Sequence, residues 1–191
     1  MKKVFCLGAV LGLTMLAANG YAQDAMKTDS KMQMSGKKNS DGKFMMMAAT
    51  SDMNEITLSN QALSKSSNEE VKKLAQMMID DHTKSSAELK PIVVSKNVML
   101  PTEADAKHKA AAEKMAAMSG SQFDMEYVKM MIKDHEKAVA LFQKESTGGK
   151  DAEAKDFAVK TLPVIQNHLD MSRSLMNKMM GGKTDTKMGG M

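Results

Sequence analysis

Cysteine, tryptophan and proline are scarce in this chain of 191 residues, which has one cysteine, no tryptophan and three prolines. The only thiol, Cys6, lies in an N-terminal segment that we expect to be removed. Disulfide bonds and thiolate metal ligands are therefore excluded from the remainder. Alternating strand patterns, a glycine-rich phosphate loop and a nucleophile set of the Ser/His/Asp or Cys/His type are also missing. Abundant alanine, lysine, methionine and glutamate favour helices instead.

The first 22 residues have the three parts of a secretory signal peptide. Two lysines precede an apolar run over residues 4–18, and the small residues Gly20 and Ala22 occupy the −3 and −1 positions of a cleavage site. The run is too short to span a membrane readily, and no later segment is a candidate for a membrane-spanning helix. The alternative, a retained N-terminal anchor, fits the three parts less well. We expect an exported protein of the periplasm, either free or associated with the outer membrane.

The rest of the chain is predicted to be one helical domain between two disordered tails. Residues 23–42 and 181–191 are polar and rich in lysine, serine, glycine and methionine, which is typical of disorder. Within 43–180, amphipathic patterns predict long helices at about 42–65, 68–96, 121–147 and 151–180, and a short one from Pro101 to near Gly120. Short connections within each pair and a long one between them predict an all-α, ferritin-like four-helix bundle. The long middle crossover would carry the short extra helix.

Several motifs along these helices resemble those of a known bacterial family. They are Ala48-Ala49, Glu55, Val71-Lys72, Asp81-His82, Leu100-Pro101, Phe123-Asp124-x-x-Tyr127, Asp134-His135, Leu162-Pro163 and His168-Leu169. Over about 44–175 the sequence resembles a domain-of-unknown-function family of exported, ferritin-like helical proteins labelled predicted outer membrane proteins. The resemblance implies the fold and an envelope location, and it implies no activity.

Four polar side chains are predicted to meet near the middle of the bundle. Each falls on the apolar stripe of a different long helix, about 13–17 residues or roughly 20–26 Å from its start. They are Glu55, His82, His135 and His168. Three imidazoles and one carboxylate suit copper, zinc or another divalent ion. The alternative is a hydrogen-bonded polar layer in which the buried glutamate pairs with histidines and fixes the helix register.

A ferritin-like di-iron oxidase needs Glu-x-x-His on two helices. The residues three positions before the histidines are isoleucines instead: Ile79, Ile132 and Ile165. The sequence therefore disfavours this metal-dependent oxidase.

Three other polar residues, Asp81, Asp134 and His108, are predicted to lie outside this group of four. Asp81 and Asp134 precede their histidines by one residue, about 100° away around the helix, so they cannot share a ligand face with them. Both aspartates can still contact a neighbouring helix. His108, between two lysines on the short helix, is predicted to be exposed.

Methionine is unusually common, with 23 residues in the chain. Those inside the helices are typical core filler. Those in the predicted tails, Met32, Met34, Met188 and Met191, offer thioether ligands suited to Cu(I). The alternatives are unconstrained composition and buffering of oxidation through sulfoxide formation.

These patterns predict a non-enzymatic helical protein of the cell envelope, related to stress, that binds metal through the Glu/His layer or the methionine tails. The alternatives are a ferritin-like metal-dependent oxidase and a purely structural or protein-interaction bundle. The formal charge is +4 and the two signs are interspersed, which does not favour nucleic acid as a partner. Envelope proteins are the expected partners, and their identity is open.

Overall fold

A computed structural model describes residues 40–181, in which five helices and no strand are present. The helices are α2 (Ser40–Lys65), α3 (Glu69–Ser95), α4 (Ala106–Ala116), α5 (Gly120–Gly148) and α6 (Ala152–Gly181). The predicted all-α fold is confirmed. The predicted signal peptide and most of both predicted tails lie outside the described residues. Residues 40–42 and Gly181, which the sequence analysis assigns to the tails, belong to α2 and α6.

Side-chain caps decide where several helices begin. The side chain of Asn68 accepts hydrogen bonds from the backbone nitrogens of the two residues that follow Glu69, and α3 begins directly after this cap. α4 begins at Ala106 rather than at Pro101, because the carboxylate of Asp105 accepts a hydrogen bond from the backbone nitrogen of His108. Pro101 is therefore wrong as the predicted start of this short helix.

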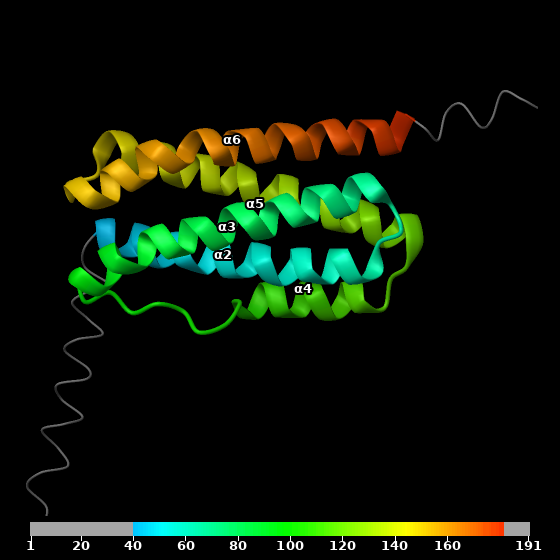
Figure 1. Ribbon diagram of the computed structural model, residues 1–191, viewed down its shortest axis with the longest axis horizontal. Helices are drawn as coiled ribbons and strands as arrows, with labels where there is room; N and C mark the ends of the chain where they lie inside the picture. Colours follow the sequence, from blue (N-terminus) through cyan, green and yellow to red (C-terminus); the bar gives the residue numbers. More distant parts are fainter. Residues whose placement is uncertain (1–39, 182–191) are drawn as a thin grey trace, which may run out of the picture. The chain divides into compact units, whose positions relative to one another are not determined.

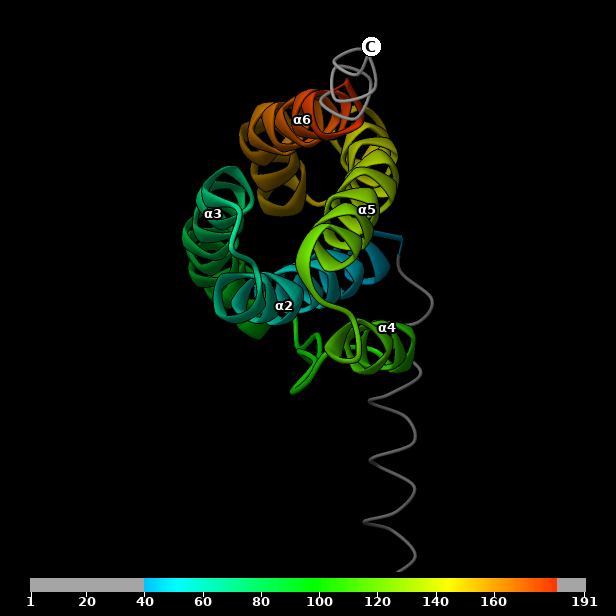
Figure 2. The ribbon, with the colours of Figure 1, turned by 90° about the vertical axis from the view of Figure 1, so that its right-hand side faces the viewer.

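The four long helices form a ring in which α2 contacts α3 and α5, and α6 contacts the same two helices (Figure 2). Consecutive partners run antiparallel, α2 with α3 and α5 with α6 (Figure 1). α3 and α5 lie diagonally across the ring, and the connection between them, residues 96–119, carries α4 along the outside of α2 and α5. This is the predicted bundle with a long middle crossover.

Two apolar clusters fill the bundle, one towards each end. One is centred on Leu58, Met78 and Tyr127, and the other on Phe44 and Phe142. The polar positions of the four long helices fall between the two clusters, so the bundle has a polar layer enclosed by apolar packing. Among residues 40–181, no helix combines the length and apolar character needed to cross a membrane.

Candidate metal centre

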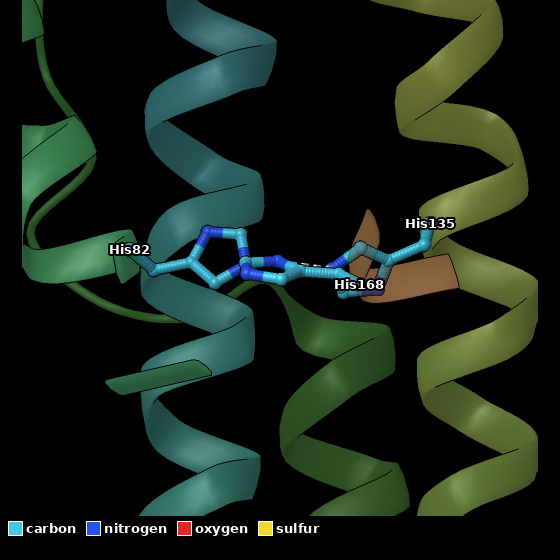
Figure 3. A group of neighbouring side chains, drawn as sticks. All are labelled: His82, His135 and His168. Carbon is cyan, nitrogen blue, oxygen red and sulfur yellow. Dashed lines mark hydrogen bonds between the residues drawn. The ribbon is translucent and has the colours of Figure 1, made fainter. Parts of the chain in front are cut away.

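Three of the four predicted polar residues converge in the enclosed layer. His82 of α3, His135 of α5 and His168 of α6 are 7%, 1% and 1% exposed. One ring nitrogen of each lies within 4.8 Å of those of the other two. The ring centroids are 5.2 to 5.6 Å apart, and Figure 3 shows the rings gathered between the helices that carry them. We call these residues the three-histidine centre.

The His82 ring is oriented by a carboxylate on the neighbouring helix α2. Its Nδ1 donates a hydrogen bond over 2.8 Å to Asp52, which also accepts one from the hydroxyl of Ser86 over 3.1 Å. Because Nδ1 carries a hydrogen, the lone pair of the neutral ring is on Nε2. Nε2 is buried and has no hydrogen-bond partner within the described residues.

The rings of His135 and His168 are oriented in the same way. His135 Nδ1 donates to the backbone oxygen of Met131 over 2.8 Å, and His168 Nε2 donates to Asp81 over 2.8 Å. The remaining nitrogens, His135 Nε2 and His168 Nδ1, lie 3.2 Å apart. A hydrogen bond between them, drawn as a dashed line in Figure 3, needs a proton on one of the two nitrogens. If both rings are neutral with the hydrogens placed as above, both nitrogens carry lone pairs and repel each other unless a proton or a metal ion lies between them.

The protonation of the three rings differs because their surroundings differ. Burial lowers the pKa of His135 to about 3, and the positive charges of His82 and His168 contribute to the shift. Burial also lowers the pKa of His168, against the opposing hydrogen bond to Asp81. For His82, burial acts to lower the pKa, but the hydrogen bond and charge of Asp52 outweigh it and raise the pKa. His135 and His168 are therefore neutral near pH 7, as metal ligands must be.

Glu55 lies at the same level but outside the group of three nitrogens. It is 1% exposed, and its nearest histidine contact in the described residues is 3.9 Å from Oε1 to Nδ1 of His135, the nitrogen bonded to Met131. Its other oxygen is buried without a hydrogen-bond partner. Burial raises the pKa of this carboxyl to about 7. The carboxylates that pair with histidines in this layer are Asp52, with His82, and Asp81, with His168. Asp52 was not among the predicted residues.

His108 is buried, so its predicted exposure is wrong. It is 7% exposed, with Nδ1 2.9 Å from Asp105 and Nε2 3.0 Å from Asp134. The neighbouring Lys107 is exposed, because successive helical residues point about 100° apart. α4 packs against α2 and α5 on the face that carries the histidine. Both ring nitrogens of His108 are thus engaged by carboxylates, unlike those of the three-histidine centre.

A small cavity adjoins the three-histidine centre. Its volume is about 20 Å³, and its lining includes Asp52, Asp81, His82 and His168. This is enough space for one water molecule or one ion. The side chain of Asp81 is 40% exposed while it accepts from His168, so it links the centre to solvent. The contact to a neighbouring helix that the sequence left open for Asp81 is therefore present.

The predicted methionine ligands Met32, Met34, Met188 and Met191 lie outside the described residues.

Asp134, which precedes His135 as Asp81 precedes His82, also contacts a neighbouring helix. Its carboxylate is bonded to His108 of α4.

The family model described as "Domain of unknown function (DUF4142)" matches residues 24–175. A search of curated proteins gives no match. The matched region includes all five helices up to the last turns of α6, and with them the three-histidine centre.

Solved structures share the fold at low sequence identity. A DUF305 fragment from Deinococcus radiodurans has a TM-score of 0.65 at 12% identity and covers 73% of this chain and 96% of its own. A putative secreted DUF305 protein from Streptomyces coelicolor has a TM-score of 0.64 at 13% identity, covering 74% and 92%. The structure described as "CopM in the Cu(II)-bound form" has a TM-score of 0.60 at 20% identity, covering 73% and 97%.

Proposed function

The chain belongs to the family described as Domain of unknown function (DUF4142), and we propose that it is an exported, non-enzymatic protein that binds a divalent transition-metal ion. The ligands are His82 Nε2, His135 Nε2 and His168 Nδ1. One observation carries the proposal: one nitrogen of each ring lies within 4.8 Å of those of the other two in one buried layer, while the opposite nitrogen of each ring donates to an acceptor. Such acceptors orient metal-binding histidines and make them stronger ligands.

The geometry favours a metal over a purely hydrogen-bonded layer. Two nitrogens bound to one tetrahedral ion at about 2.0–2.1 Å would be roughly 3.3 Å apart. His135 Nε2 and His168 Nδ1, at 3.2 Å, have this separation. The three ligand nitrogens together spread over up to 4.8 Å, so the third would move closer to the other two on binding. His82 Nε2, buried without a partner, would otherwise cost about 1–3 kcal/mol. A bound cation removes both this cost and the lone-pair repulsion. Glu55, buried at the same level, compensates part of the charge of the ion.

Copper is the first candidate for the ion and zinc the second. Imidazole ligands suit both, and Cu(II) stands highest in the order of divalent affinities. A protein of the same fold is described in a Cu(II)-bound form, which supports copper. A bound ion of this kind supplies a buried positive charge that ties three helices together.

The ligand set supports storage or sequestration rather than oxidase chemistry. Isoleucines stand where a di-iron site needs carboxylates, at Ile79, Ile132 and Ile165. The N-terminal signal pattern supports export, and one structural relative is described as a putative secreted protein. We assign the protein to metal capture in the envelope under metal stress. We also assign binding of soft metal ions to the thioethers of the tail residues Met32, Met34, Met188 and Met191.

Competitive titration of the full chain with Cu(II) and Zn(II) against a chromophoric chelator tests the proposal. We expect one tightly bound ion per chain and a loss of affinity of more than about 100-fold in His82→Asn, His135→Asn and His168→Asn. His108→Asn is the matched control, because this buried histidine has both nitrogens engaged by carboxylates. Absence of stoichiometric binding, or an equal loss in the control, would overturn the proposal and leave a structural polar layer.

A further inference from the structure

A methionine-lined groove lies between the start of α5 and the end of α6, away from the three-histidine centre. Its volume is about 590 Å³, and three of its lining residues are Met125, Met176 and Met180. α5 and α6 are antiparallel neighbours, which brings the first turns of one beside the last turns of the other (Figure 1). Met125 and Met176 are half-buried and Met180 is 57% exposed, so the groove is open to solvent.

The spacing of these methionines allows their sulfur atoms to meet. Met176 and Met180 are four residues apart on α6, and side chains at this spacing start about 5–6 Å apart on one helix face. Met125 faces them from α5 across the same groove. The methionine side chain has three rotatable bonds, so these side chains can turn their thioethers towards the groove that all three line.

Core packing accounts for only part of this group, because Met176 packs against the apolar cluster centred on Leu58, Met78 and Tyr127, whereas Met180 is 57% exposed. Met78, Met115 and Met131 fill the apolar interior and are at most 1% exposed, as expected of core filler. A side chain such as Met180, more than half exposed, buries too little surface to be selected for packing alone. The thioether itself is the property that distinguishes these positions from leucine.

The charges around the groove permit a monovalent cation. Two lysines and two glutamates lie among the lining residues: Glu126, Lys129, Lys133 and Glu136. The charges of the lining itself therefore sum to zero, and Arg173 beside it adds one positive charge. The carboxylate of Glu136 accepts from Arg173 over 2.8 Å, which holds one glutamate at the edge. The groove offers no imidazole and no thiol, and its two carboxylates lie beside cations, Glu136 beside Arg173 and Glu126 beside Lys114. Its soft donors are the thioether sulfurs, which favour Cu(I) over divalent ions.

We infer that this groove is a binding site for a soft monovalent metal ion, Cu(I) or Ag(I), held by the thioethers of Met125, Met176 and Met180. The inference does not rest on the three-histidine centre, which has nitrogen ligands and suits a divalent ion. The chain would thus carry two metal sites of different chemistry, one enclosed and one open to solvent.

Equilibrium dialysis of the full chain against Ag(I), which needs no reductant, tests the inference. The test variant is Met125→Leu/Met176→Leu/Met180→Leu. The matched control is Met47→Leu/Met99→Leu/Met171→Leu, which removes three thioethers whose exposed fractions are 43%, 69% and 42%. We expect the test variant to bind one Ag(I) per chain fewer than the control. Equal binding by the two variants would overturn the inference.

Methyl NMR of the wild-type chain gives an answer that does not depend on a variant folding. With methionine methyl groups labelled, the signals of Met125, Met176 and Met180 should shift together and saturate at one added Ag(I). Shifts that miss these three signals would contradict the inference. The test variant should also keep Cu(II) affinity within about twofold of wild type, so failure of this inference and failure of the three-histidine proposal give different results.

Discussion

Two consecutive aspartates, Asp80 and Asp81, illustrate how position on a helix decides the role of a residue. Asp81 accepts from Nε2 of His168 on the neighbouring helix over 2.8 Å. Asp80 is exposed and accepts from Gln76 of its own helix over 2.8 Å. The two side chains differ by about 100° around α3. Of these two aspartates, only Asp81 can therefore orient a ring of the three-histidine centre.

Asp81→Ala should weaken Cu(II) binding by about 10- to 100-fold, because the His168 ring loses the acceptor that fixes its orientation. Asp80→Ala, one residue away in the same helix, should leave the affinity unchanged within about twofold. Competitive titration of both variants measures the difference. An equal effect of the two substitutions would show that Asp81 acts on the centre only through the general charge of the helix.

At the level of residues, sequence patterns predicted the histidines better than their partners. The position of His82, His135 and His168 along their helices predicted one common layer, because helical rise is fixed. Asp52 was missed because its role depends on how α2 faces α3. A usable signal was present: Asp52 is three residues before Glu55, and this spacing places both on the same helix face.

At the level of elements, α4 shows where sequence patterns stop being sufficient. It is short and rich in alanine, and its apolar face gives no sign of which helices it will cover. The burial of His108 follows from the packing of α4 against α2 and α5. The hydrogen bond from His108 to Asp134 of α5 attaches the crossover to the bundle, while the bond to Asp105 lies within the crossover.

This attachment should depend on pH. The hydrogen bond to Asp134, followed by that to Asp105, outweighs burial and raises the pKa of His108 above its ordinary value of 6.5. Because the pKa of His108 is higher in the folded state than in the unfolded state, charged His108 stabilises the folded state in full below about pH 6.5. This stabilisation is lost as the pH rises through the folded-state pKa. His108→Asn should therefore lower the free energy of unfolding by about 1–3 kcal/mol at pH 6 and by less at pH 9.

Urea unfolding of wild type and His108→Asn at both pH values, followed by circular dichroism, measures this difference. Effects of the other titrating groups cancel because the two chains share them. A deficit that is equal at the two pH values, or larger at pH 9, would contradict the assignment of a charged His108 between its two carboxylates.

The end of α5 offers a paired test of close packing. An added Cβ at Gly149 would lie 2.7 Å from both the backbone oxygen and the Oε1 atom of Glu145, whereas a Cβ at Gly148 would meet nothing within 4 Å. Gly149→Ala should therefore lower stability by about 1–3 kcal/mol. Gly148→Ala should raise it by about 0.5–1 kcal/mol, because Gly148 is the last residue of the helix and alanine is the better helix former. Thermal unfolding that ranks the two variants in the opposite order would contradict this packing.

At the level of the whole molecule, the bundle and its crossover were predictable because the long helices carry strong amphipathic patterns and the connections differ clearly in length. The two apolar clusters on either side of a polar layer follow from the same patterns. The convergence of one ring nitrogen from each of three histidines was not predictable, because it depends on side-chain orientation within the layer.

A metal ion bound in this layer should stabilise the folded chain as a whole, since its ligands come from α3, α5 and α6. At a free concentration of about 100 times the dissociation constant, binding adds roughly 2.7 kcal/mol. For a domain of this size that corresponds to an increase of about 5–10 °C in Tm. Calorimetry with and without Cu(II) measures the shift. His135→Asn should abolish it, and an unchanged Tm at saturating Cu(II) would count against binding to the folded state.

The most direct test of the three-histidine centre is pulsed electron paramagnetic resonance of the full chain loaded with one equivalent of Cu(II). We predict nitrogen couplings from three imidazoles, falling to two in His168→Asn and remaining three in His108→Asn. A spectrum without imidazole couplings, or one that His82→Asn, His135→Asn and His168→Asn all leave unchanged, would contradict the account.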